Sequence, residues 1–353
     1  MQQKRRWITL AVGVVYAFIA MFVMLYAVNN REVIIEDNRN EQMLSEFTQK
    51  TDKKENNSWE ILTLSEEKSQ DKEIAIPVGQ GIRNENLILK NDYINRELWI
   101  SIDGMREITF DENIFVKNVA NIQEAVYEIQ GDTVQVKLTL DAIYECRSVL
   151  EDNYLYIDLM KPKEAYERII VVDPYGNDEG MSSRKAGIKE KEFTLDVAKR
   201  IGKKISSNHA IKVYYTRTDD AIMSVEERLQ LISETEADFY IGIALNESEE
   251  TSVYGVETVC NGTYFIPFFG NTQLADCVER NVTQQVSGRA NGLTQAKEED
   301  IILQKTKIPA VILKAGYLSN EKEAELLNKE EYRDLIAEGI LLAVQEAYEK
   351  NGE

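Results

Sequence analysis

The chain has 353 residues, with 41 Lys and Arg against 61 Asp and Glu, which gives a net charge of −20. Its 43% hydrophobic and 29% charged residues are ordinary for a globular protein, so the composition excludes wholesale disorder, and the length leaves room for one large or two modest domains. The acidity disfavours nucleic acid and anionic lipid as partners, because both need a basic surface. A metal site built from two or three histidines is excluded by count, since the chain contains one His.

Residues 7–28 form an uncharged run that follows Lys4-Arg5-Arg6. A helix of this length rises about 33 Å, enough to cross a hydrocarbon core of ~30 Å. The alternative is a cleaved signal peptide, but its apolar region is usually only about 7–15 residues and ends in a small-x-small site. The run is longer and lacks such a site. We therefore expect residues 1–31 to be a cytoplasmic basic end and a single-pass anchor in the cell membrane, with the bulk of the chain extracytoplasmic.

Residues 32–72 are rich in Asn, Glu, Lys and Gln and contain no Gly or Pro. Such a composition buries little apolar area to offset the entropy of ordering the chain. The segment is predicted to be a flexible acidic tether.

From residue 73 to 162 the hydrophobic pattern alternates with a period of two. The clearest runs are residues 98–102, 134–140 and 154–159, and Asp103-Gly104 and Gly131-Asp132 supply turn sequences. Short alternating runs separated by such turns predict a small all-β domain. It shows no catalytic constellation, so a binding or spacer module is expected.

From residue 163 to the C-terminus, strand and helix patterns alternate. The predicted strands are 169–173, 211–215, 239–243 and 310–313, and the predicted helices are 190–205, 225–235, 274–286 and 332–348. This order predicts an α/β fold with an open, mostly parallel sheet covered by helices on both faces. Sites in such sheets gather beyond the carboxyl ends of the strands, which points to Asp173, residues 244–246, Lys314 and, at the start of the first helix, Glu190.

This half of the chain resembles the zinc-dependent N-acetylmuramoyl-L-alanine amidases, which cut the lactyl–peptide amide of peptidoglycan. The motifs that carry the resemblance run in order along residues 171–174, 190–195, 216–220, 224–228, 237–241 and 308–320. The β domain is similar, much more weakly, to the wall-targeting domains that precede such amidases.

The sequence departs from the family pattern at the zinc-ligand and catalytic positions. The family's Asp-Pro-Gly-His-Gly-Gly motif, whose His binds zinc, reads Asp173-Pro174-Tyr175-Gly176-Asn177 here. The resemblance implies that Glu190 matches the family's second zinc ligand. Ala244 occupies the position of the third ligand, the His of Ser-Ile-His-x-Asn, and Lys314 occupies the position of the catalytic Glu. Zinc in a catalytic site needs three protein ligands, and a general base must accept a proton near neutral pH. No intact catalytic residue and no zinc or other cofactor are therefore expected.

Two functions remain open. The first is a pseudoamidase that binds a peptidoglycan stem peptide or a cell-envelope protein through the rim residues Asp173, Glu190, Asn246 and Lys314. The second is an active N-acetylmuramoyl-L-alanine amidase that hydrolyses peptidoglycan through a rebuilt site, an inference from family likeness alone. The deficit of ligands favours the first, so whether the chain is an enzyme stays open. Neither function involves nucleic acid.

We further hypothesise that Lys314 replaces the charge of the metal and pairs directly with Glu190, because an unpaired buried charge is unfavourable. In the alternative, both side chains lie in an open, wet cleft.

The remaining candidates are weak. Asp178 and Glu179 read as a polar loop rather than a hard-cation site. His209 precedes a strand, at the edge opposite the site, and reads as a solvated turn residue. Cys146, Cys260 and Cys277 read as free thiols, since a nucleophilic Cys would need a nearby base. Tyr175 and Tyr317 could stack on a ligand or pack in the core.

Overall fold

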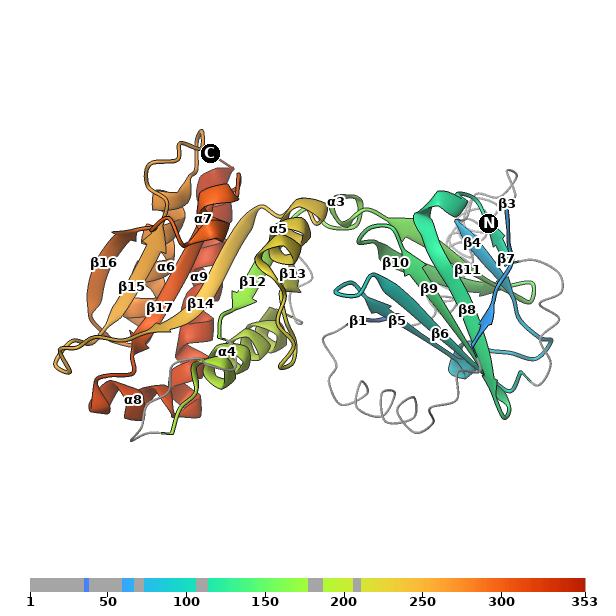
Figure 1. Cartoon of the computed structure of the whole chain (residues 1–353), viewed down its shortest axis with the longest axis horizontal. Helices are drawn as coiled ribbons and strands as arrows, with labels where there is room; N and C mark the ends of the chain where they lie inside the picture. Colours follow the sequence, from blue (N-terminus) through green and yellow to red (C-terminus); the bar gives the residue numbers. More distant parts are fainter. Residues whose placement is uncertain are drawn as a thin grey trace, which may run out of the picture. The chain divides into compact units, whose positions relative to one another are not determined.

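The computed structural model describes residues 35–37, 59–66, 73–105, 114–176, 187–205 and 211–352. The chain divides into two compact units, Met1–Met160 and Lys161–Glu353. Figure 1 shows the strands and helices of both units. The predicted positions of Asp178, Glu179 and His209 lie outside the described residues, as does the predicted anchor at 7–28.

The first unit is built from two β-sheets that enclose one apolar core. One sheet has the order β1-β5-β6-β9-β8-β2 and the other the order β10-β11-β4-β7-β3. The alternating runs of the sequence lie in β6 (Glu97–Asp103), β9 (Thr133–Leu140) and β11 (Tyr154–Met160), which confirms these three strands. Ile100, Val136 and Ile157 are among the residues that fill the core between the sheets.

The remaining elements of this unit are β4 (Ile74–Pro77), β5 (Leu87–Asp92), β7 (Ile114–Val116), β8 (Ile122–Gln130), β10 (Glu145–Glu151) and the short 3-10 helices Asn84–Asn86 and Val119–Asn121. Three further strands lie in the segment predicted to be a tether: β1 (Ile35–Asp37), β2 (Glu60–Ile61) and β3 (Leu64–Glu66). They pair with β5, β8 and β7 respectively. These parts of the segment are strands because backbone pairing at a sheet edge needs little apolar sequence.

A search of the described residues finds no helix with the length and apolar character that crossing a bilayer requires.

The second unit is an α/β domain around a six-stranded sheet of order β13-β12-β14-β17-β15-β16. Its strands are β12 (Ile169–Pro174), β13 (Lys212–Tyr215), β14 (Phe239–Asn246), β15 (Val256–Cys260), β16 (Ala290–Gln295) and β17 (Ala310–Tyr317). The pairs β12–β13, β12–β14, β14–β17 and β15–β16 are parallel. Only β15 runs antiparallel to its neighbour β17 among these described pairs, so the sheet is mixed and mostly parallel.

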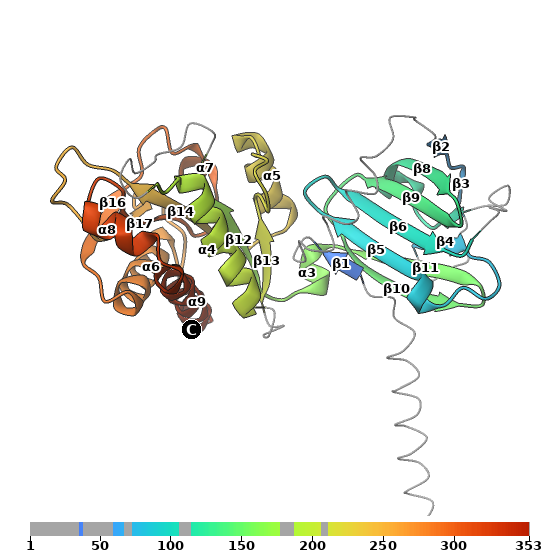
Figure 2. The ribbon, with the colours of Figure 1, turned by 90° about the horizontal axis from the view of Figure 1, so that it is seen from below.

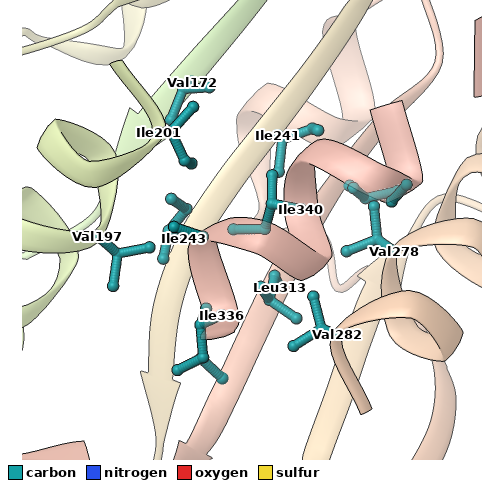
Figure 3. Packing of buried hydrophobic residues seen from close by; sticks show 14 of the residues in the cluster. Val172, Val197, Ile201, Ile241, Ile243, Val278, Val282, Leu313, Ile336 and Ile340 are labelled. Atoms are coloured by element: carbon teal, nitrogen blue, oxygen red, sulfur yellow. The ribbon is translucent and has the colours of Figure 1, made fainter. Parts of the chain in front are cut away.

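Three long helices pack on one face of this sheet: α4 (Glu190–Ile205), α6 (Asn271–Gln285) and α9 (Glu330–Asn351) (Figure 2). Phe193, Val197, Ile201 and Ile205 of α4 recur at helical spacing and are buried. Figure 3 shows how Val197 and Ile201 meet Val172 and Ile243, while Val278 and Val282 of α6 lie near Leu313.

Gly339 lets α9 approach α6 closely, because a Cβ at this position would lie 2.6 Å from the Cα of Val282. A side chain at residue 339 would push the two helices apart, so the close packing of α9 on α6 requires glycine at this position.

The other helices are α3 (Pro162–Ala165), α5 (Val225–Glu234), α7 (Ile301–Lys305) and α8 (Glu321–Leu327). In Figure 2, α5 and α7 lie on the side of the sheet opposite α4, α6 and α9. The start of α5 is fixed by a capping box, in which Glu227 N–H donates to Ser224 Oγ at 3.2 Å and Ser224 N–H donates to Glu227 Oε2 at 2.7 Å. The prediction of helices on both faces is therefore confirmed.

Candidate active site

The predicted site residues meet at the carboxyl edge of the parallel strands. Ala244 of β14 is paired with Lys314 of β17, and Asn246 is paired with Tyr317. The sequence predicts these residues to lie just beyond the strands. In the structure they are the last residues of the strands, because β14 continues to Asn246 and β17 to Tyr317. Their side chains therefore sit on the sheet itself rather than on flexible loops.

Glu190 and Lys314 bind the same residue from two sides. Glu190, buried at the start of α4, accepts a hydrogen bond at Oε1 from the backbone N–H of Leu245 at 2.7 Å. Lys314 Nζ donates to the carbonyl oxygen of Leu245 in a long hydrogen bond of 3.5 Å. The described residues thus give no direct ion pair between the two side chains, and the hypothesis of such a pair is wrong. The peptide backbone of Leu245 donates one hydrogen bond to Glu190 and accepts one from Lys314.

The two side chains still interact through their charges. Burial raises the pKa of Glu190 above its ordinary value of 4.5, and this is the largest influence on the group. The hydrogen bond from Leu245 and then the positive charges of Lys314 and Arg217 oppose the shift without cancelling it. Lys314 therefore contributes a positive charge near a carboxylate that is costly to ionise.

Arg217 fixes the start of α4 against the end of β12. Its Nε donates to Pro174 O at 2.8 Å, and its Nη2 donates to Lys191 O at 2.7 Å and to Thr194 Oγ1 at 3.1 Å. Thr194 in turn donates to the carbonyl of Tyr175. These bonds position the first turn of α4, and with it Glu190.

Asp173 lies inside the domain, not at a rim open to ligand. Its exposed fraction is 0%, and its carboxylate accepts hydrogen bonds from Thr216 Oγ1 at 2.5 Å and from the hydroxyl of Tyr240. Arg228 pairs with the same carboxylate at 3.3 Å. Three donors occupy this carboxylate, so its expected role in substrate binding is corrected to a structural one.

Tyr175 packs over a glycine of the neighbouring strand. A Cβ on Gly242 would lie 2.8 Å from Cε2 of Tyr175 and 3.0 Å from Cγ1 of Ile312. The guanidinium of Arg228 lies 5.4 Å from the centre of the Tyr175 ring, and the hydroxyls of Tyr175 and Tyr240 are 3.2 Å apart. Burial, followed by the negative charge of Asp173, raises the pKa of Tyr175. The ring is thus a fixed part of the site wall.

Asn246 belongs to a polar cluster that the sequence did not indicate. Glu257 of β15 accepts hydrogen bonds from Tyr317 Oη at 2.8 Å, Thr294 Oγ1 at 2.8 Å and Asn246 Nδ2 at 3.2 Å. Burial, with the hydrogen bond to Glu257, raises the pKa of Tyr317 to about 12. The β-branched residues in 256–260 (Val-Glu-Thr-Val-Cys) are the sequence signal that favours a strand here.

Glu257 also faces the candidate site, since it is the cross-strand partner of Lys314. Its two oxygens are occupied by the three donors of the cluster rather than by the ammonium group. Asn246 is therefore held beside Lys314 by a hydrogen bond to Glu257.

The three cysteines form no disulfide, and Cys260 and Cys277 are buried while Cys146 is half-buried. Burial raises the pKa of both Cys260 and Cys277, which keeps these thiols protonated and unreactive.

The α/β domain matches the family described as N-acetylmuramoyl-L-alanine amidase over residues 170–346, about half of the chain. The chain belongs to this family. The match begins in β12 and ends in α9, so this amidase domain includes all the strands and helices that form the candidate site.

Two curated relatives and one solved structure illustrate the likeness. N-acetylmuramoyl-L-alanine amidase LytC of Bacillus subtilis (strain 168) is 27% identical over 171 residues, which are 48% of this chain and 34% of LytC. Probable cell wall amidase LytH of Staphylococcus aureus is 29% identical over 177 residues, which are 49% of this chain and 56% of LytH. The chain thus spans about a third and about half of the length of these two relatives.

The solved structure is that of an N-acetylmuramoyl-L-alanine amidase from Clostridium difficile 630. It is 29% identical, covers 52% of this chain and 97% of its own chain, and has a TM-score of 0.48.

The described residues at the amidase site offer few donor atoms to a zinc ion. Glu190 is a single carboxylate, and one of its oxygens is bonded to Leu245 N–H. The side chain of Ala244 has no atom that can bind a metal. The fourth residue of the family's Asp-Pro-Gly-His motif, counted from Asp173, corresponds to Gly176, where even a Cβ would lie 2.6 Å from the Cα of Lys191. The ammonium of Lys314 adds a positive charge to a place where a cation would bind. Within the described ranges, no three His, Cys, Asp or Glu side chains are grouped to hold a metal ion.

Proposed function

We propose that this chain is a membrane-anchored, extracytoplasmic pseudoamidase that binds a peptidoglycan stem peptide, or a cell-envelope protein that offers similar groups, without hydrolysing it. The amidase fold supports the choice of ligand, and the altered site supports the loss of hydrolysis. The degenerate zinc ligands and the substituted catalytic Glu are part of the same proposal.

The observation that carries this proposal is the place of Lys314. The sequence resemblance assigns it the family's catalytic Glu position, and its ammonium lies 3.5 Å from the carbonyl oxygen of Leu245. Hydrolysis of an amide needs a group that takes a proton from the attacking water. An ammonium group has no lone pair with which to accept that proton, so Lys314 cannot serve as the base.

The same residues are suited to hold a ligand. Lys314 has three N–H donors, of which the described structure uses one in the long bond to Leu245. Glu190 has one oxygen bonded to Leu245 and a second that can accept from a ligand. A half-buried ammonium beside a carboxylate can bind the carbonyl and the N–H of a peptide together, which gives binding without a chemical step.

The anchor is the second component of the proposal. The uncharged run at residues 7–28, preceded by Lys4-Arg5-Arg6, supports a single span with its N-terminus in the cytoplasm. Protease protection of the full-length chain in right-side-out vesicles tests this point: residues beyond 31 should be digested from outside. Full protection of the amidase domain would contradict it.

One observation favours a second candidate, an active amidase with a rebuilt site. The raised pKa of Glu190 is a property that general acids and bases in enzymes share. In that case Glu190 would activate water without the family's remaining groups, and hydrolysis would depend on Glu190 alone.

The two candidates are separated by incubating the purified full-length chain with purified peptidoglycan. Pelleting measures binding, and chromatography of the supernatant measures released stem peptides. We expect binding without release, and weaker binding for Lys314→Gln. Lys297→Gln is the matched control, because Lys297 is a 76% exposed lysine whose ammonium pairs with Glu299 rather than with a site residue. Steady release of stem peptides, abolished by Glu190→Gln, would establish the second candidate instead.

A further inference from the structure

A loop between β15 and α6 presents large apolar side chains to solvent. Residues 262–269, here named the aromatic loop, read Gly-Thr-Tyr-Phe-Ile-Pro-Phe-Phe and contain no charged residue. Phe268 is 97% exposed, Phe265 is 82% exposed and Tyr264 is 43% exposed. Isolated exposed apolar residues are common, but three aromatic side chains on one short loop form a patch of the kind that marks an interaction surface.

The aromatic loop is held in this conformation by its own base. Asn261 Oδ1 accepts from Thr263 Oγ1 at 2.8 Å, Asn271 Nδ2 donates to Asn261 O at 2.9 Å, and Gly262 N–H donates to Gln295 Oε1 at 3.1 Å. Phe269 is buried, with its ring 5.6 Å from that of Phe239. The exposed rings are thus presented by a fixed support.

Phe268 also has a strained backbone. Its φ is +65°, in the left-handed region that a bulky side chain rarely adopts. This conformation turns the ring of Phe268 outward while the next residue, Phe269, enters the core. A strained residue that exposes an aromatic ring is a recognised sign of a functional surface.

The aromatic loop lies at the end of the amidase domain opposite the candidate site. Because β15 runs antiparallel to β17, its first residues are beside Lys314 and its last residue, Cys260, is paired with Val311. The loop that follows Cys260 is therefore at the amino edge of the parallel strands, whereas Glu190 and Lys314 are at their carboxyl edge. A surface that bound the loop would leave the site open.

We propose that the aromatic loop inserts into the outer surface of the membrane that holds the anchor, and so orients the amidase site away from the bilayer. This inference rests on the anchor of the proposed function. The rings of Phe265 and Phe268 protrude rather than line a groove, and insertion into a bilayer needs no matching shape from a partner. Aromatic side chains at the level of lipid headgroups are a common device of membrane-associated proteins.

The predicted anchor keeps the aromatic loop near the bilayer, which a loop with few apolar side chains needs in order to insert. A membrane span makes a second, weak attachment effective, because it raises the local concentration of that second attachment at the bilayer. The predicted span at residues 7–28 is the first attachment, and the aromatic loop is the second. The net charge of −20 opposes anionic lipid, so apolar insertion rather than charge attraction drives the contact.

The test places a fluorescent reporter on the aromatic loop of the full-length chain. Phe265→Trp and, separately, Phe268→Trp proteins are reconstituted into phosphatidylcholine vesicles with and without brominated acyl chains, which quench tryptophan at short range. Ile222→Trp is the matched control, because Ile222 is an exposed apolar residue, at 45%, on the loop that follows the carboxyl end of β13. All these proteins, and the otherwise wild-type chain used for comparison, carry Trp59→Phe and Trp99→Phe, so that native Trp7 alone reports the anchor.

We expect both loop reporters to lose more fluorescence than the wild-type chain in brominated vesicles, and Ile222→Trp to lose no more than wild type. Quenching of Trp7 without extra quenching at positions 265 and 268 would overturn the insertion of the loop and leave the anchor standing. Equal extra quenching at position 222 would also overturn it, since the domain would then have no preferred orientation. No quenching of Trp7 or of the loop reporters would overturn both the anchor and the loop insertion. None of these outcomes bears on hydrolysis, which the peptidoglycan assay decides separately.

Discussion

Glu190 and Lys314 bind the N–H and the carbonyl of one residue, Leu245, and so support the end of β14 from two neighbouring elements. The arrangement joins the start of α4 to β17 through a backbone segment rather than through a shared ion. The resemblance to zinc amidases implies a metal at this place, where the described residues offer one carboxylate and one ammonium.

Glu190→Gln is expected to make the protein more stable at neutral pH. The folded state raises the pKa of Glu190 above 4.5, so the stability that its protonated form provides is present below pH 4.5 and is lost as the pH rises through the folded pKa. Gln keeps an oxygen for Leu245 N–H and removes the charge. Urea unfolding at pH 4 and pH 8 measures the difference, which should appear at pH 8 only.

Glu190→Ala is the informative comparison for this prediction. It removes the charge as Glu190→Gln does but also the acceptor of a buried N–H, so its free energy of unfolding should be lower than that of Glu190→Gln by about 1–3 kcal/mol at both pH values. If Glu190→Gln were as destabilising as Glu190→Ala at pH 8, the assignment of a costly buried charge would be incorrect.

Lys314→Glu is expected to destabilise the protein near neutral pH. The substitution replaces an attractive charge near Glu190 with a repulsive one, and each further unit of increase in the pKa of Glu190 corresponds to about 1.4 kcal/mol. The loss should shrink as the pH falls and the carboxylates become protonated. Thermal melting across this pH range, with NMR titration of the Glu190 carboxyl, measures both effects.

Lys297→Glu makes the same change of charge on a side chain that is 76% exposed, and should leave the melting temperature nearly unchanged. An unchanged melting temperature for Lys314→Glu as well would mean that the charge of Lys314 has no structural role.

Gly242→Ala is expected to disturb the ring of Tyr175. The added Cβ would lie 2.8 Å from Cε2 of the ring, so the free energy of unfolding should fall by about 1–3 kcal/mol. In a Tyr175→Ala background the same change should cost less, because the nearest obstructing group is gone and Ile312 Cγ1 at 3.0 Å remains. Chemical denaturation of the four proteins gives this coupling free energy.

Gly79→Ala is a suitable control for this cycle, since a Cβ at Gly79 meets no atom within 4 Å. Equal losses for Gly242→Ala with and without the Tyr175 ring would show that the ring is not packed against β14.

Asp173→Ala is expected to lower the free energy of unfolding by about 3–5 kcal/mol, because it leaves the guanidinium of Arg228 and the hydroxyls of Tyr240 and Thr216 without their acceptor. Asp173→Asn retains an oxygen and should be less harmful. Denaturation measures the effect, with the exposed Glu298→Ala as a control that should change little. A small effect of Asp173→Ala, with weaker peptidoglycan binding, would return Asp173 to the ligand-binding residues.

The periodic elements of this protein could be predicted from the sequence because their apolar residues recur at regular spacing. Helix α4 occupies Glu190–Ile205 as predicted, and β12 and β14 begin where the apolar runs begin. β15 and β16 were not foreseen. The exposed β16 reads Ala-Asn-Gly-Leu-Thr-Gln, with a glycine at a φ of +95° and little apolar alternation.

The sequence predicts which residues approach the candidate site, but it does not predict the hydrogen bonds and ion pairs that these residues make. Position along a strand shows that Asp173 and Lys314 approach one edge of the sheet, but it does not show burial. The carboxylate of Asp173 accepts hydrogen bonds from Arg228 and Tyr240, which are 55 and 67 residues away in the chain. The Glu257 cluster likewise depends on an antiparallel pairing that local sequence does not specify.

The most direct test of the altered site is the zinc affinity of the full-length chain, measured by competition with a chromophoric chelator after removal of metal. A site with one carboxylate ligand and a neighbouring ammonium predicts no stoichiometric zinc, and a melting temperature that zinc and chelators leave unchanged. One tightly held zinc per chain, lost in Glu190→Gln, would contradict the account and restore a metal-dependent amidase.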